Sequence, residues 1–266
     1  EWNTNLTYST NKNEIKSISN DEFSMSTDWF TTGHTGEPIQ TTTHRVKVGC
    51  PIGDFYGLKS VGLTTDGKWL VERFDENGKK FYDYANNATE ADWQILGNGV
   101  PTHYLNFNNT LRYKNWDLTI GMRGAFGFQI LNYQEMYYGN PTIQYNVLNS
   151  AFDTHPTYEI VDGGYGIKRA NKDVSISDSQ RYVSEYVEDG DYWKIDNVTL
   201  GYTFNTKTWK YVKNLRLYAS CLNLATITGY KGLDPEVRMT GLDAGTDSRD
   251  KYPTNRSFTF GVNVTF

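Results

Sequence analysis

Residues 116–129 read WDLTIGMRGAFGFQ, and apolar and polar side chains alternate over all fourteen positions. One face carries Trp116, Leu118, Ile120, Met122, Gly124, Phe126 and Phe128, and the other carries Asp117, Thr119, Gly121, Arg123, Ala125, Gly127 and Gln129. A period of two predicts a β-strand with one apolar face and one wet face. A helix is excluded, because these apolar residues would lie all round its axis. The strand is longer than the ~5–6 residues usual in soluble proteins.

A second alternating segment, residues 103–113, directly precedes this strand. Only Lys114 and Asn115 separate Tyr113 from Trp116, so the two segments are expected to form a hairpin with a very tight turn. Aromatic residues on both sides of such a turn are typical of a membrane interface.

The same pattern recurs along the chain and predicts eight strands, at about 2–14, 42–50, 54–65, 103–113, 116–129, 191–204, 214–225 and 255–266. The connections between them alternate in length. Short ones lie at 51–53, 114–115 and 205–213, and long ones at 15–41, 66–102, 130–190 and 226–254. This alternation predicts an all-β fold, an antiparallel transmembrane β-barrel segment with short periplasmic turns and long extracellular loops.

The last predicted strand, NRSFTFGVNVTF at 255–266, ends the sequence. We expect its alternating apolar residues to face lipid: Phe258, Phe260, Val262, Val264 and Phe266. The first residues, EWNTNLTYST, show neither the basic region nor the apolar region of a signal peptide. We therefore expect either that a signal was cleaved or that the chain is a piece of a longer one.

Composition narrows the class of protein. A net charge of -5 and a pI near 5.4 argue against nucleic-acid binding, which needs a basic face. No run approaches the ~20 apolar residues of a transmembrane helix. Aromatic residues make up 15% of the chain, which fits either a sugar-binding surface or membrane girdles. Cys50 and Cys221 lack the spacing of a disulfide framework or a zinc site, and we interpret both as unpaired thiols.

No motif for catalysis or metal binding is apparent. The histidines are scattered, at His34, His44, His103 and His155, without metal-ligand spacing. Acidic loop residues such as Asp243, Asp247 and Asp250 do not match a calcium loop, and we interpret them as solvated. Sequences for a serine nucleophile or a phosphate-binding loop are also missing. We therefore predict no enzyme activity, no catalytic residues, no cofactor and no metal.

The predicted long loops are rich in aromatic residues, namely Trp69, Tyr82, Tyr84, Trp93, Tyr137, Tyr138, Tyr145, Tyr158, Tyr165 and Tyr230. Their rings are able to stack on sugar rings or peptide side chains. They are equally able to pack the loops against one another, because aromatic residues dominate buried contacts in general. Sequence alone leaves both interpretations open.

Several segments resemble the motifs of SusC-like (SusC/RagA family) TonB-dependent transporters. Residues 48–63 read VGCPIGDFYGLKSVGL, 95–120 read ILGNGVPTHYLNFNNTLRYKNWDLTI, and 215–237 read LRLYASCLNLATITGYKGLDPEV. Residues 192–204 and 252–266 are similar to further strands at the end of the family's barrel. The resemblance covers nearly the whole chain. The departures are small, with Leu58 where the family usually has tyrosine and Leu105 where glycine is common.

This resemblance implies that residues 1–266 are the C-terminal portion of a barrel of about 22 strands, with about eight of the strands here. The plug domain and TonB box would lie outside this chain. Such transporters import oligosaccharides or oligopeptides across the Gram-negative outer membrane. The expected partners are a SusD-like surface lipoprotein, the rest of the barrel and plug, the TonB system, the outer-membrane assembly machinery, the lipid membrane and a glycan or peptide substrate, but no nucleic acid.

Among the loop aromatics we expect Trp69, Trp93, Tyr137, Tyr138 and Tyr230 to contact substrate or lid, and Phe266 to act as a C-terminal assembly signal. One alternative is a self-contained eight-stranded outer-membrane barrel with a structural or adhesive role. A secreted carbohydrate-binding module is a further alternative, which the apolar stripe of 116–128 contradicts. Pairing of 2–14 with 255–266 would close an eight-stranded barrel, whereas an open sheet favours the transporter.

Overall fold

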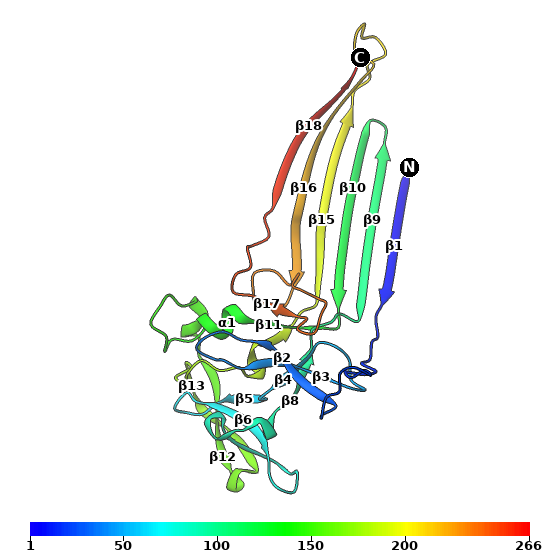
Figure 1. The fold of residues 1–266 in the computed structure, drawn as a ribbon. Coiled ribbons are helices and arrows are strands. Elements are labelled where there is room, and N and C mark those ends of the chain that lie inside the picture. The colour runs from blue at the N-terminus through cyan, green and yellow to red at the C-terminus, as the bar shows by residue number, and fades with distance from the viewer.

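The computed structural model describes residues 1–266. Its largest sheet has six antiparallel strands. In spatial order the strands are β1 (Trp2–Thr10), β9 (His103–Tyr113), β10 (Trp116–Phe126), β15 (Tyr192–Thr203), β16 (Asn214–Thr228) and β18 (Ser257–Thr265). Figure 1 shows them side by side, with both chain termini towards the same end of the sheet. The predicted all-β, antiparallel fold is confirmed.

The register of the strands gives this sheet one apolar face. Trp116 of β10 pairs with Tyr113 on one side and Tyr202 on the other. Towards the far edge, Phe260 of β18 pairs with Ala219 of β16. Trp116 is 50% exposed and Phe260 is 82% exposed. Large apolar side chains exposed across a whole face need apolar surroundings, and this face is therefore suited to lipid.

The predicted number of eight membrane strands is wrong, because only six strands form this sheet. Segments 42–50 and 54–65 do contain an antiparallel hairpin, β3 (Thr42–Lys47) with β4 (Asp54–Gly57). This hairpin belongs to a separate four-stranded sheet with β2 (Trp29–His34) and β8 (Gln94–Asn98). Neighbouring residues on both of its faces are buried, such as Asp54 and Phe55. A lipid-facing strand would instead leave one face exposed.

The strand predicted at 116–129 ends early, at Phe126. Gly127 has a φ of 74°, a left-handed conformation that glycine adopts readily. Its backbone N–H donates to Oδ1 of Asp191 at 2.6 Å. The chain turns here into β11 (Gln129–Asn132), and Phe128 becomes fully buried instead of continuing the outer apolar face.

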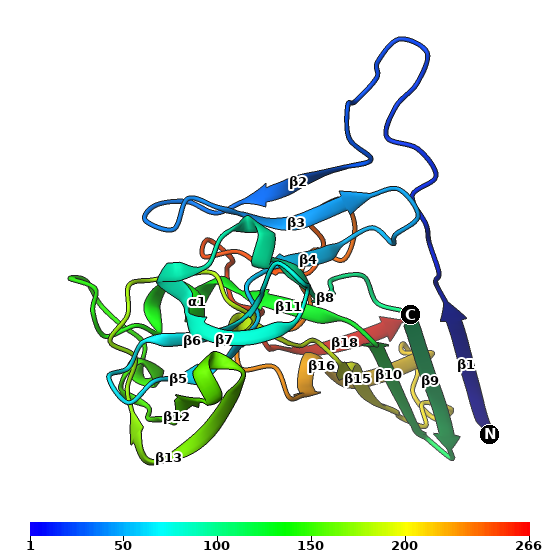
Figure 2. The same ribbon diagram turned by 90° about the horizontal axis from the view of Figure 1, so that it is seen from below.

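Three long connections, 11–102, 127–191 and 229–256, fold together at one end of the sheet, and we call this part the loop layer. Besides the four-stranded sheet it contains a five-stranded and a three-stranded sheet. Their remaining strands are β5 (Ser60–Leu63), β6 (Trp69–Phe74), β7 (Lys80–Tyr84), β12 (His155–Val161), β13 (Gly166–Val174), β14 (Val187–Asp189) and β17 (Thr246–Asp247). Figure 2 shows that the loop layer extends well to one side of the six-stranded sheet.

The helices of the loop layer are short. They are α1 (Tyr133–Tyr138) and the 3-10 helices η1 (Ala85–Asn87), η2 (Glu90–Asp92), η3 (Asn149–Phe152), η4 (Asp162–Gly164) and η5 (Ser184–Tyr186). None has the length and apolar character needed to cross a membrane. The core of the layer is a cluster of 13 buried residues drawn from the first two connections, with Phe55, Trp69 and Tyr137 among the largest.

The opposite end of the sheet has only two connections, 114–115 and 204–213, and both are short. The predicted alternation of long and short connections is thus confirmed for the six strands, whereas the predicted turn at 51–53 lies inside the loop layer. The sheet is open, since β1 pairs only with β9 and β18 only with β16. The two edge strands do not pair with each other, so the alternative of a closed eight-stranded barrel is wrong.

Candidate functional site

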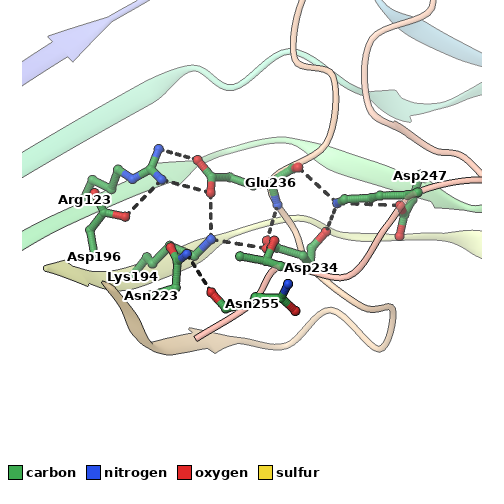
Figure 3. Close-up of polar contacts among 10 residues, drawn as sticks. Arg123, Lys194, Asp196, Asn223, Asp234, Glu236, Asp247 and Asn255 are labelled. Carbon is green, nitrogen blue, oxygen red and sulfur yellow. Dashed lines mark hydrogen bonds and ion pairs between the residues drawn. The ribbon is translucent and has the colours of Figure 1, made fainter. Parts of the chain in front are cut away.

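Charged side chains gather where the loop layer meets the polar face of the sheet (Figure 3). We call this group the junction cluster, and it consists of Arg123, Lys194, Asp196, Asp234, Glu236, Asp247 and Lys251. The first three belong to β10 and β15, and the other four to the 229–256 connection between β16 and β18. The cluster therefore joins the wall of the sheet to one long connection.

An irregularity in β15 positions the strand side of the cluster. The pairing of β15 with β16 shifts register between Ile195 and Asn197, and Asp196 has no partner across either neighbouring strand. A β-bulge of this kind bends a strand and redirects a side chain. The Asp196 carboxylate accepts a hydrogen bond from Nη2 of Arg123 at 3.1 Å, which orients the guanidinium towards the loop layer.

The segment Asp234-Pro235-Glu236 supplies two carboxylates from the loop side. Oδ1 of Asp234 accepts from the backbone N–H of Glu236 at 2.9 Å, a local bond that aspartate commonly makes in turns. Pro235 fixes the φ angle between the two acids. Nζ of Lys194 donates to Oδ2 of Asp234 at 3.2 Å and to Oε2 of Glu236 at 2.7 Å. Both guanidinium Nη atoms of Arg123 also donate to Glu236.

The central ion pair is deeply buried, with Lys194 1% and Asp234 4% exposed. Buried charges require close partners, and Asp234 accepts from Thr254 as well as from Lys194 and Glu236. Burial acts to raise the pKa of Asp234. Hydrogen bonds from Thr254 and the Glu236 backbone, together with Lys194, outweigh burial and hold that pKa below its usual value. The Asp234 carboxylate is therefore ionised at neutral pH.

Lys251 and Tyr230 form contacts within the 229–256 connection. Nζ of Lys251 donates to the backbone carbonyls of Asp234 at 2.7 Å and Glu236 at 3.0 Å, and lies 3.7 Å from Oδ1 of Asp247. The Tyr230 hydroxyl donates to Oδ2 of Asp247 at 2.6 Å. Burial, and then this carboxylate, raise the pKa of Tyr230. Asp247 is 1% exposed, so the interpretation of this acid as solvated is wrong.

Three of the five aromatic residues predicted to contact substrate or lid are buried. Trp69 and Tyr137 lie in the core of the loop layer. Tyr230 packs in a second, five-residue cluster with Phe128 and Tyr192, beside the junction cluster. Rings that the protein itself covers do not stack on a ligand, so the prediction does not hold for these three. Their abundance reflects packing of the loops.

Trp93 and Tyr138 are partly exposed, and for them the predicted contact stays a prediction. Trp93 lines a hollow of about 450 Å³ together with Gln180 and Arg181. Tyr138 meets Tyr145 edge to face, with ring centres 6.0 Å apart. Tyr145 lines a neighbouring hollow of about 610 Å³, which shares Gln180 with the first. The loop layer thus offers two adjoining hollows, each with an aromatic residue in its lining.

Sequence reasoning misses the junction cluster, because its partners lie far apart in the chain. Arg123 and Glu236, for example, are separated by 113 positions. The one local signal is the pair of acids on either side of Pro235, which lies within a segment that resembles the transporter motifs.

Comparison with known proteins gives relatives of one kind. No protein-family model matches the chain. A TonB-dependent receptor P3 of Formosa agariphila is 30% identical over the whole chain, which covers 27% of that receptor. The TonB-dependent receptor SusC of Bacteroides thetaiotaomicron is 27% identical, again over the whole chain and 24% of the receptor. The relatives are named as receptors and not as enzymes, in agreement with the prediction of no enzyme activity.

The fold has solved counterparts. The RagAB peptide importer in its closed-closed state superposes with a TM-score of 0.72 at 17% identity, over the whole chain and 28% of that structure. The open-open state of the same importer gives a TM-score of 0.69 at 15% identity, over 27% of that structure. The chain spans 24 to 28% of the length of the curated relatives that it matches. Motifs, relatives and fold together identify the chain as part of a SusC-like TonB-dependent receptor.

Proposed function

We propose that this chain is the C-terminal part of the barrel of an outer-membrane importer. The complete protein would take up an oligosaccharide or oligopeptide nutrient across the outer membrane of a Gram-negative cell, driven by the TonB system. Within it, residues 1–266 would provide six strands of barrel wall, the polar lining of the lumen and three extracellular loops.

The observation that carries this proposal is the six-stranded sheet with one exposed apolar face and two free edges. The backbone N–H and C=O groups of a free edge are not viable in lipid without partners. The outer edges of β1 and β18 therefore call for further strands of the same barrel. With the apolar face in lipid, the polar face lines the lumen, and the loop layer covers one end of it.

The loop layer is the surface that we assign to the external partners. A SusD-like lipoprotein and the substrate would meet it from outside, with Trp93 and Tyr138 as contact residues. The plug and the TonB box would belong to regions outside this chain. Phe266 would be read by the outer-membrane assembly machinery. No nucleic acid is expected to bind a chain with a net charge of -5.

Cysteine accessibility in intact cells tests the orientation. In the complete receptor with Cys50→Ser, we would introduce Asn77→Cys in the loop layer or Thr208→Cys in the 204–213 connection, both at exposed positions. A membrane-impermeant maleimide should label the first variant in intact cells and the second only after the outer membrane is disrupted. The reverse pattern would refute the proposed topology.

Uptake measurements test import and separate the two substrate classes. Cells with and without the complete receptor would be given labelled oligosaccharide or oligopeptide mixtures. We expect receptor-dependent uptake of one class, and loss of that uptake when TonB is removed. Uptake of neither class, or uptake that is independent of TonB, would contradict the proposed transport function.

A further inference from the structure

The end of the sheet opposite the loop layer has a local charge opposite to that of the chain. The whole chain has 26 Lys and Arg against 31 Asp and Glu. At this end the basic residues prevail, with Arg112, Lys114, Lys207, Lys210, Lys213 and Arg216 against Glu1 and Asp117. The two acids are already engaged, Glu1 by Arg112 and Asp117 by Arg216. The four lysines therefore carry the uncompensated charge.

Three of these lysines project from one short connection, 204–213, which contains no acidic residue. Lys207, Lys210 and Lys213 are all exposed. The same connection exposes Trp209 by 46% and Tyr211 by 73%. Lysine beside exposed aromatic rings is typical of segments that lie at the level of lipid headgroups. In Figure 1 the connection lies at the tip of the sheet, beside the C-terminus.

A wholly apolar hollow of about 420 Å³ lies on the outer face next to this connection. Its lining residues are Trp116, Leu200, Tyr202, Phe204, Leu217, Tyr218, Ala219 and Phe260. The register explains the hollow, because the small Ala219 pairs with Leu200 on one side and Phe260 on the other. Tyr202 contacts Phe204 edge to face at 4.9 Å between ring centres, on the side of the hollow that leads to the connection.

The spacing of the two features matches one lipid molecule. From Lys213 to Ala219 the strand advances six residues, or roughly 20 Å at ~3.3 Å per residue. Because barrel strands are tilted by ~35–45°, this distance spans roughly 15 Å of membrane depth, which is about half of the ~30 Å hydrocarbon core and therefore one leaflet. A phosphate held at the lysines would therefore place an acyl chain over the hollow. Phe204 belongs to both features, since it lines the hollow and begins the connection.

We propose that the 204–213 connection and the adjoining hollow form a binding site for a phospholipid with an anionic headgroup from the periplasmic leaflet. The lysines would hold the phosphates, and the hollow would hold one acyl chain. Three cations without acidic partners favour an anionic headgroup over a zwitterionic one. The proposal rests on the proposed function, because it requires the apolar face to lie in the membrane.

Lipid retention by the complete receptor tests the site. We would purify the receptor from outer membranes in mild detergent and quantify bound phosphatidylglycerol and phosphatidylethanolamine by mass spectrometry. The variant Lys207→Gln/Lys210→Gln/Lys213→Gln removes the charges, and Ala219→Trp fills the hollow. The lysine variant should reduce bound phosphatidylglycerol by about tenfold or more, and Ala219→Trp should also reduce it. The matched control Lys168→Gln/Lys172→Gln, at exposed lysines of the loop layer, should leave bound lipid unchanged.

Folding of each variant would be checked by the shift in gel mobility between unheated and heated samples, which folded barrels show. Unchanged phosphatidylglycerol in either folded variant would overturn the single-site proposal, and so would equal retention of both lipids by the unmodified receptor. Failure of the proposed function would be seen separately, because labelling of Asn77→Cys in intact cells, at the opposite end of the sheet from the 204–213 connection, does not depend on bound lipid.

Discussion

Replacing Lys194 by methionine tests whether the junction cluster holds the 229–256 connection on the wall of the sheet. The Lys194 ammonium is buried and lies 3.2 Å from Asp234 and 2.7 Å from Glu236. Methionine retains the unbranched apolar stem but lacks the charge. After the change, Asp234 stays buried without its cation, whereas Glu236 is 26% exposed and keeps Arg123.

The expected loss of stability follows from this difference between Asp234 and Glu236. Removing one partner of a buried ion pair typically costs about 3–5 kcal/mol. Since Glu236 retains a partner, the loss falls mainly on Asp234, and we expect the lower end, about 3 kcal/mol. At about 1.4 kcal/mol per factor of ten, local opening of the connection should become roughly 100-fold more frequent.

Hydrogen exchange followed by mass spectrometry on the complete receptor measures this opening directly. In Lys194→Met, peptides from 229–256 should exchange roughly 100-fold faster, as their opening equilibrium shifts. Peptides from the middle of β15 and β16 should be unaffected. Lys231→Met is the matched control, because Lys231 is exposed on the same connection. Exchange in Lys194→Met within a few-fold of the unmodified receptor would refute the reasoning, as would equal acceleration in the strands.

Three further outcomes are expected. Trp69→Ala should destabilise the loop layer by about 3–5 kcal/mol, because the ring is fully buried, and unchanged resistance of the layer to limited proteolysis would contradict this. Burial acts to raise the pKa of Asp234, but hydrogen bonds, first from Thr254, and the charge of Lys194 lower this pKa overall. The stability that ionised Asp234 contributes is therefore complete above the usual pKa of ~3.9, and it is lost as pH falls through the lower pKa of the folded state. Hydrogen exchange of its connection, corrected for intrinsic rates, should therefore accelerate below about pH 4, and a flat profile would count against it. Phe266→Ala should reduce the amount of folded receptor in the outer membrane on immunoblots without changing its thermal stability, and equal amounts would argue against an assembly signal.

The sequence predicts the six-stranded sheet well where one face of a strand is exposed. The hairpin of β9 and β10 is an example, since Leu111 pairs with Leu118 and Phe107 with Met122 on its apolar face, where Asn109 is an exception. The same alternation at 42–50 misleads, because a strand with both faces buried also mixes apolar and polar residues: His44 is fully buried and bonds to the carbonyl of Ala244 at 2.9 Å. The alternation of apolar and polar residues alone does not show whether the apolar face of a strand contacts lipid or the rest of the protein.

Burial separates the loop aromatics in a way that composition does not. Trp69 and Trp93 both lie in the 11–102 connection, yet the first is buried in the core and the second lines a recess. The burial of Trp69 involves contacts with the 127–191 connection, such as its edge-to-face contact with Tyr186 at 6.0 Å between ring centres. Such contacts depend on how two distant loops meet, which a single sequence does not reveal.

The joint between the loop layer and the wall uses ion pairs because of where it lies. The inner face of the sheet is polar, so a loop that crosses it finds few apolar side chains to cover. A small apolar cluster of five buried residues around Tyr230 lies beside the ion pairs. Buried ion pairs restrict the position of a loop closely, because buried charges are tolerated only with good geometry and enough hydrogen-bonding partners. The first two connections, by contrast, hold each other through a core of 13 buried residues. Charge therefore contributes to holding the 229–256 connection on the wall of the sheet, and Lys194 is the buried cation of that joint.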